Sequence, residues 1–279
     1  MTRALIPFVL CLLFQGQNLS AQRGSKLYWQ QQANYNILVD VDVITSKYSG
    51  SQEIIYTNNS PDTLSSVYFH LFYNAFIPGS EMDQHSRSLA DPDPRVLDKI
   101  SLLKKPDQGY LSVSSLKQDG VLVKNTVAGT ILEVKLNKAV EPGKKTVFKM
   151  TFSGQAPLMV RRAGKNSSEG VSLSMAQWFP KLAEYDYEGW HADPYIGREF
   201  YGVWGSFDVV INIDKNYTVG GTGYLESKTQ SPLNKKMTSW RFKAPNVHDF
   251  TWAADPDFIH DRRTMINGTV LNFYYKKTL

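Results

Sequence analysis

Apolar and polar side chains alternate along several short stretches of this chain. In residues 37–44, ILVDVDVI, the side chains of Val39, Val41 and Val43 lie on one face and those of Asp40 and Asp42 on the other. This period of two predicts a half-buried β-strand. Strand-like runs recur between turn residues at 53–57, 64–72, 130–136, 139–152, 207–213, 238–244 and 269–275. No long stretch has the 3.6-residue period of a helix, so the pattern predicts an all-β fold of sandwiched or stacked sheets.

Two segments interrupt this pattern. Residues 76–110 are the least regular, and we expect at most one short helix there, with Asp93 as its N-cap and Pro94 in its first turn. The glycine-rich residues 219–223, VGGTG, stand between strand-like runs with no helix after them. Phosphate-binding loops require a helix N-terminus or a nest of N–H groups, so we expect a turn or bulge there.

The N-terminus has the pattern of a secretory signal peptide. Arg3 precedes the apolar run ALIPFVLCLLF, and the small residues of LSA end at Ala21. The alternative is a membrane anchor, but this run is too short to span a bilayer. We therefore expect a signal peptide at 1–21, a lead-in at 22–34 and one β domain at 35–279. The mature protein would be periplasmic or extracellular, with no transmembrane segment.

Cysteine content and charge exclude several classes of function. The only cysteine, Cys11, lies within the apolar run, so the mature chain has no disulfide, thiol nucleophile or cysteine-ligated zinc. The net charge is +5, from 31 Lys and Arg against 26 Asp and Glu, but the basic residues are scattered as pairs. A nucleic-acid groove requires them to be clustered, so we expect no nucleic-acid partner.

The sequence contains none of the common catalytic motifs that we considered. There is no Gly-x-Ser-x-Gly and no His-Glu-x-x-His. Glu188 and His191 have the Glu-x-x-His spacing that places two ligands on one helix face, but Gly189 and the surrounding prolines and aromatics argue against a helix. We therefore expect no metal site and no catalytic residue within the chain.

Residues 174–202 are unusually rich in aromatic and charged side chains, and they carry a resemblance to a known family. Trp178-Phe179-Pro180, an acidic-aromatic loop and the later GTG of 221–223 resemble the N-terminal domain of M1 zinc aminopeptidases, especially the exported bacterial branch. The opening strands from Tyr35 and the run NVHDFTWAADPDF, 246–258, are similar to the same domain. The resemblance extends over nearly the whole mature chain.

The resemblance implies a fold and a partner. In that family a saddle-like, all-β N-terminal domain packs on a thermolysin-like catalytic domain, which holds the zinc and activates a water for peptide cleavage. Its His-Glu-x-x-His and Gly-x-Met-Glu-Asn motifs do not occur here. We therefore expect a non-catalytic N-terminal domain that binds no cofactor itself. Its partner would be a catalytic domain, in cis or in trans, which carries the zinc and takes peptide substrates.

The resemblance also suggests candidate substrate-binding residues. Many relatives have a Gln-x-Glu or Gln-x-Gln element before the Pro, whose last residue holds the substrate's ammonium group. Glu169 is the acid nearest to the matching position but does not coincide with it, and Gln177 is the nearest amide. Gln177 and Trp178 would either line the peptide cleft or only stabilise the loop.

Two alternatives to the aminopeptidase domain remain open. One is a standalone exported module that binds peptides or glycans through its aromatic side chains, and the other is a regulatory subunit that docks on a separate catalytic chain. An exposed apolar patch near Trp178, Trp190 and Tyr201 would favour a domain that docks. A closed, concave pocket would favour a binding module.

Overall fold

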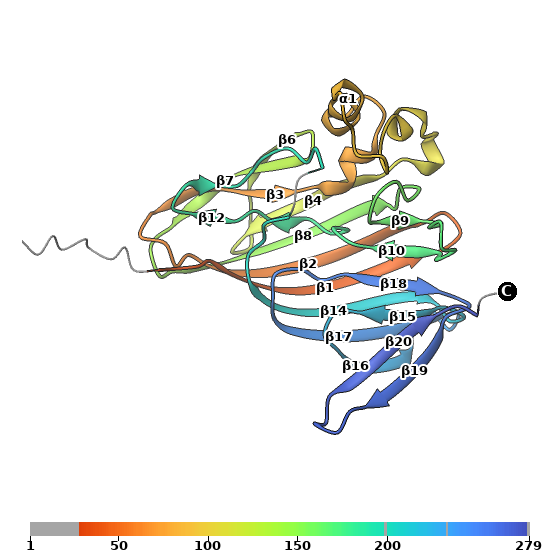
Figure 1. Cartoon of the computed structure of the whole chain (residues 1–279). Helices are drawn as coiled ribbons and strands as arrows, with labels where there is room; N and C mark the ends of the chain where they lie inside the picture. The colour runs from red at the N-terminus through yellow and green to blue at the C-terminus, as the bar shows by residue number, and fades with distance from the viewer. Residues whose placement is uncertain (1–27, 198–199, 233, 278–279) are drawn as a thin grey trace, which may run out of the picture.

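A computed structural model describes residues 28–197, 200–232 and 234–277 of the chain, so the expected signal peptide lies outside the described residues. Its largest part is an eight-stranded sheet with strand order β16-β17-β14-β1-β2-β8-β4-β5, called here the large sheet (Figure 1). Its strands are β1 Gln32–Asp42, β2 Lys47–Thr57, β4 Tyr110–Gln118, β5 Val121–Leu122, β8 Lys145–Gln155, β14 Gly205–Asp214, β16 Tyr224–Gln230 and β17 Met237–Val247.

Strand β1 lies in the middle of the large sheet. It confirms the half-buried strand that the alternation of residues 37–44 predicts. Tyr35, Ile37, Val39 and Val41 are buried on one face, which we call the inner face. The strand pairs antiparallel with β2 and parallel with β14. It begins at Gln32, so the last three residues of the expected lead-in already belong to the sheet.

Two four-stranded sheets and two hairpins accompany the large sheet. One sheet has the order β11-β3-β7-β6 and the other β15-β18-β10-β9. Their strands are β3 Leu64–His70, β6 Lys124–Ala128, β7 Ile131–Val140, β11 Lys181–Leu182, β9 Gly164–Lys165, β10 Leu173–Met175, β15 Thr218–Gly221 and β18 Trp252–Asp255. The hairpins are β12 Tyr185–Asp186 with β13 Gly189–Trp190, and β19 Ile259–Thr264 with β20 Val270–Tyr275. The expected all-β fold of stacked sheets is confirmed.

The helix expected at Asp93 was placed wrongly. The α-helix is α1 Glu81–Ser88, whose N-cap Ser80 accepts a hydrogen bond from the backbone N–H of Asp83. Ser80 thus satisfies a free helical N–H, as N-cap serines do. Asp93 instead pairs with Arg95 in a turn, and short 3₁₀ turns follow at Lys99–Leu102 and Lys105–Asp107, in addition to Phe72–Phe76 earlier in the chain.

The glycine-rich run 219–223 is also more regular than expected. Its first three residues belong to β15, which pairs with β18, and only Thr222 and Gly223 form a bend before β16. Gly223 has φ +83°, and a Cβ atom there would lie 2.3 Å from the carbonyl oxygen of Lys243. The glycine is therefore required by the close approach of β17, and the run has a structural role.

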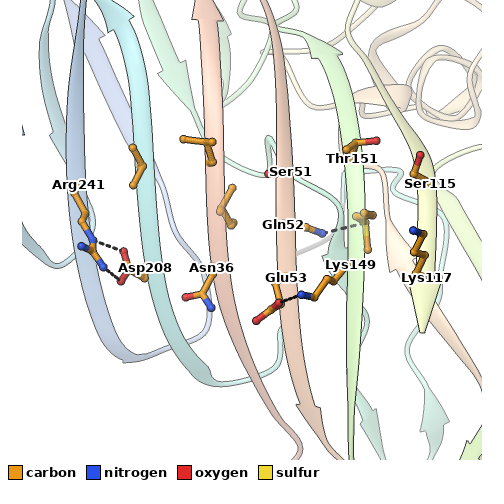
Figure 2. Close-up of a pocket in the computed structure, with 14 residues that line it drawn as sticks. Asn36, Ser51, Gln52, Glu53, Ser115, Lys117, Lys149, Thr151, Asp208 and Arg241 are labelled. Atoms are coloured by element: carbon orange, nitrogen blue, oxygen red, sulfur yellow. Dashed lines mark hydrogen bonds and ion pairs between the residues drawn. The ribbon is translucent and has the colours of Figure 1, made fainter. Parts of the chain in front are cut away.

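The face of the large sheet opposite to the inner face is polar. Two ion pairs cross neighbouring strands there, Arg241 with Asp208 at 2.6 Å and Lys149 with Glu53 at 2.6 Å (Figure 2). They border a shallow depression of about 580 Å³ whose lining includes no aromatic side chain. The charges within each pair neutralise each other and Lys117 adds one further positive charge to the lining, so this face has the mixed charges that are usual on the solvent-facing side of a sheet.

Figure 1 shows the β19–β20 hairpin projecting beside β16 and β17, whereas α1 lies at the other end of the stack, near β3 and β4. Within the described residues, no helix has the length and apolar character needed to cross a membrane.

Candidate functional site

The backbone of residues 178–182, within the aromatic-rich segment, is hydrogen-bonded to side chains on the inner face of the large sheet. Tyr48 on β2 donates its hydroxyl proton to the carbonyl oxygen of Trp178 at 2.7 Å, and Gln52 donates to that of Pro180 at 2.8 Å. The hydroxyl of Tyr35 on β1 accepts a hydrogen bond from the backbone N–H of Leu182 at 3.1 Å. Side chains of the sheet thus satisfy alternate backbone groups of a segment that has few strand partners of its own.

Trp178 is a core residue. Its exposed fraction is 0%, and its indole Nε1 donates to the carbonyl oxygen of Phe250 at 3.1 Å. The ring packs edge-on or tilted against Tyr48, Phe152, Phe179 and Trp252. In this structure the ring has no free surface with which to contact a substrate.

The three residues suggested by the resemblance do not share one exposed surface. Gln177 is also buried, with a left-handed φ of +54°, and its Nε2 lies 3.5 Å from Asp249 Oδ2. Glu169 stands in an exposed turn, where its carboxylate accepts a hydrogen bond from Ser168. Substrate binding by Glu169, Gln177 and Trp178 stays a prediction, and the burial of two of them favours their structural alternative.

Lys181 of the aromatic-rich segment lies close to two carboxyl groups, and we call Lys181, Glu184 and Asp249 the buried cluster. The Lys181 side chain is 2% exposed, and its Nζ lies 3.3 Å from Asp249 Oδ2. A Cβ atom at Gly202 would lie only 2.7 Å from the same Nζ. Burial lowers the pKa of Lys181, while the Asp249 carboxylate acts in the opposite direction. Sequence reasoning missed this cluster because Lys181 and Asp249 are far apart along the chain.

Glu184 is the carboxyl group of the buried cluster with a strongly shifted pKa. Burial raises its pKa to about 7, and the nearby Asp186 carboxylate adds to the effect, against the hydrogen bond from the N–H of Tyr185. In the unfolded chain a glutamate ionises near its ordinary value of about 4.3. Glu184 therefore opposes folding increasingly as the pH rises from about 4.3 to 7, because only the unfolded state then loses its proton.

We expect the variant Glu184→Gln to become more stable relative to the wild type as the pH rises from 5 to 8. The glutamine keeps the shape of the protonated carboxyl group and cannot ionise. Urea unfolding of both proteins at several pH values measures the difference in the free energy of unfolding. A difference that does not change over this range would show that Glu184 ionises normally in the folded protein.

The β12–β13 hairpin brings three potential ligand side chains together at the surface. Asp186, Glu188 and His191 each offer one ligand atom, and these atoms lie within 4.8 Å of one another. Asp186 accepts hydrogen bonds from the backbone N–H of Glu188 at 2.8 Å and from the hydroxyl of Tyr201 at 3.1 Å. Burial opposes ionisation of Asp186, but these bonds and His191 outweigh it and lower its pKa.

No metal site was expected at Glu188 and His191, because Gly189 and the surrounding prolines and aromatics argue against a helix there. The two-residue turn at Tyr187 and Glu188, with Gly189 at φ +99°, brings them together by another route. The spacing Asp-x-Glu-x-x-His around a Gly is the signal that would have indicated this.

A small cavity of about 170 Å³ adjoins this hairpin. His191 and Tyr201 line it, together with His70 and the phenyl rings of Phe72 and Phe200. Burial and the Lys181 ammonium group lower the pKa of His70 to about 4, so its imidazole is neutral at neutral pH.

A large open groove lies beside the β19–β20 hairpin. Its volume is about 1350 Å³, and it is lined by β16, β18 and β20. Apolar side chains exposed around it include Tyr224, Leu225 and Leu271, and Phe273 and Tyr275 are exposed on the same hairpin. We call this groove, with its exposed lining residues Tyr224, Leu225 and Leu271, the apolar groove; Phe273 and Tyr275 do not line it. Ser174, Met175 and Ala176, at the start of the aromatic-rich segment, line part of the groove, whereas Trp178 itself is buried and does not.

Comparisons with known proteins identify the fold but match nothing by sequence. No family model matches the chain, and no curated protein does. Among solved structures, a two-domain M1 zinc metallopeptidase mutant bound to L-tryptophan has a TM-score of 0.52 and 11% identity, over 88% of this chain and 47% of its own. An M1 zinc metallopeptidase mutant from Deinococcus radiodurans, bound to a Tyr-Ser-Ala substrate, has a TM-score of 0.53 and 12% identity, over 90% and 49%.

The likeness at this low identity shows the fold alone. The described chain has the architecture of about half of a two-domain M1 zinc metallopeptidase, and it spans about half the length of these proteins. The all-β architecture expected from the resemblance is thereby confirmed.

Proposed function

We propose that this chain is the non-catalytic N-terminal β domain of an exported zinc aminopeptidase of the M1 type. It would pack on a thermolysin-like catalytic domain, in cis or in trans, and border the peptide cleft of that domain. The zinc would belong to the catalytic domain, because the residues of a His-Glu-x-x-His site do not occur in these 279 residues. Export follows from the signal-peptide pattern of residues 1–21.

The observation that carries the proposal is the coverage of the fold match. About 90% of this chain corresponds to about half of each two-domain metallopeptidase, so the other half has no counterpart here. The sequence elements at 178–180, 221–223 and 246–258 point to the same family independently of the fold. Fold alone does not define an activity, so the proposal depends on both observations.

The apolar groove supports a domain that docks on another domain. Large exposed apolar patches are uncommon on monomers and usually mark interaction sites. Tyr224, Leu225 and Leu271, which line the groove, are 68%, 42% and 38% exposed. A partner domain that packs against this groove would shield these side chains from water.

We expect the isolated chain to bind the dye 8-anilinonaphthalene-1-sulfonate (ANS) or to self-associate through the apolar groove. The variant Leu271→Asp should reduce the dye fluorescence severalfold, because it places a charge at the groove. Leu38→Asp is a matched control, since Leu38 is 42% exposed but lies on the polar face of the large sheet. A monodisperse chain that does not bind the dye would contradict the docking proposal.

The coding DNA downstream of Leu279 distinguishes the proposal from its alternatives. An open frame that continues into a His-Glu-x-x-His domain supports an aminopeptidase domain in cis. A stop codon with a separate catalytic gene beside it supports docking in trans. A stop codon with no catalytic gene nearby favours a standalone module, and binding assays with peptides and glycans would then test it.

A further inference from the structure

We propose that Asp186, Glu188 and His191 of the β12–β13 hairpin bind a divalent metal ion of the zinc class. The proposal is independent of any catalytic domain and revises the expectation that the chain holds no metal. It concerns a separate site on the β domain itself.

The chemistry of the three side chains fits such an ion. Two carboxylates and one imidazole are the donor types that Zn²⁺ takes in proteins, at about 2.0–2.2 Å from each donor atom. Ligand atoms within 4.8 Å of one another can surround one ion at these distances with only small side-chain adjustments. Three protein ligands leave room for water or for a group of a partner.

The contact between His191 and Asp186 is a second observation that points to a cation. His191 Nε2 lies 2.9 Å from Asp186 Oδ2. Nε2 has almost no surface open to solvent, so its contact with this carboxylate takes the place of a contact with water. An ion that binds both atoms takes the place of any proton between them, because imidazole and carboxylate ligands bind metals in their deprotonated forms.

The adjoining cavity supplies a third observation. His70, which is more than nine-tenths buried, lines this cavity together with His191, and its Nδ1 also has no hydrogen-bond partner among the described residues. The volume of about 170 Å³ holds several waters, at about 30 Å³ each. The cavity therefore has room for ordered water beside the His191 ring.

Tyr201 acts as a positioning residue for this site. Its hydroxyl donates to Asp186 Oδ2, and its ring lies edge-on to the His191 ring at 4.8 Å between centroids. The tyrosine thus orients one carboxylate and one imidazole at once. Partners of this kind orient the ligands in established metal sites, where their loss weakens binding by about 10–100-fold.

Isothermal titration of the metal-free full chain with ZnCl₂ tests the proposal. We expect one Zn²⁺ per chain, and dissociation constants at least about tenfold higher in Glu188→Gln and His191→Gln. Glu188 is exposed at the tip of a turn, so Glu188→Gln tests the site without affecting the fold. His85→Gln on α1 is the matched control and should bind as the wild type does. Tyr201→Phe should weaken binding without changing the stoichiometry.

A second measurement separates this site from adventitious binding. At the same Zn²⁺ concentration, the thermal unfolding midpoint should rise more in the wild type and in His85→Gln than in Glu188→Gln. Equal affinities in the wild type, Glu188→Gln and His191→Gln would overturn the proposal, and so would the absence of saturable binding.

Discussion

Replacing Trp178 by alanine is expected to lower the free energy of unfolding by about 3–5 kcal/mol, the range for large aromatic side chains in cores. The indole is fully buried, and it contacts aromatic rings from β2, β8 and β18. The substitution also leaves the carbonyl oxygen of Phe250 without its hydrogen-bond donor. Equilibrium unfolding in urea measures the loss.

Trp204→Ala provides the matched control. Trp204 is 39% exposed and contacts the ring of His248, so its loss should cost about 1 kcal/mol or less. A comparable loss in both variants would show that the effect is not specific to the core position. A loss below about 1 kcal/mol for Trp178→Ala would contradict the position of Trp178 in the core. It would favour the alternative that Trp178 lines the peptide cleft.

Removing the charge of Asp249 is expected to destabilise the fold by about 3–5 kcal/mol, the usual cost when one member of a buried ion pair is lost. In Asp249→Asn the buried ammonium group of Lys181 has no fully charged carboxylate beside it. The Lys181 side chain is 2% exposed and that of Asp249 12%, so the lysine is the member that water cannot reach. Urea unfolding at pH 7 measures the effect.

Two further variants test whether the stranded charge is the cause. Asp257→Asn removes a carboxylate that is 72% exposed in its ion pair with Lys276, and should change stability by less than about 0.5 kcal/mol. The double variant Lys181→Met/Asp249→Leu removes both charges and should recover most of the loss. If the double variant is no more stable than Asp249→Asn, packing rather than charge explains the destabilisation.

Strands with one buried face show an apolar period in the sequence, whereas most exposed strands do not; β20 is exposed but was predicted because its sequence, VLNFYY, is apolar. β1 and β14 alternate between buried and exposed positions, and their sequences show it. β16 and β19 are exposed on nearly all positions, so no apolar period marks them. In β4, Ser115 has φ +54° at an irregularity in the pairing with β8, which interrupts the alternation of its apolar residues.

The sequence by itself determined the fold class, because burying one face of a strand is a local pattern that the chain displays directly. It also located the aromatic segment at 174–202 and the elements at 178–180 and 246–258 that resemble M1 aminopeptidases.

Only the tertiary structure decided what the side chains of this segment do. An amphipathic tryptophan suits both a core and a cleft, and the choice depends on distant residues such as Tyr48, Phe152 and Trp252 that pack around Trp178. The contact between Lys181 and Asp249 and the surface triad at 186–191 likewise depend on chain reversals that bring polar groups together. Residue spacing does not encode the contact between Lys181 and Asp249, because sheet pairings bring these distant residues together, whereas the local spacing of the triad becomes informative only once the turn at Tyr187 and Glu188 is known.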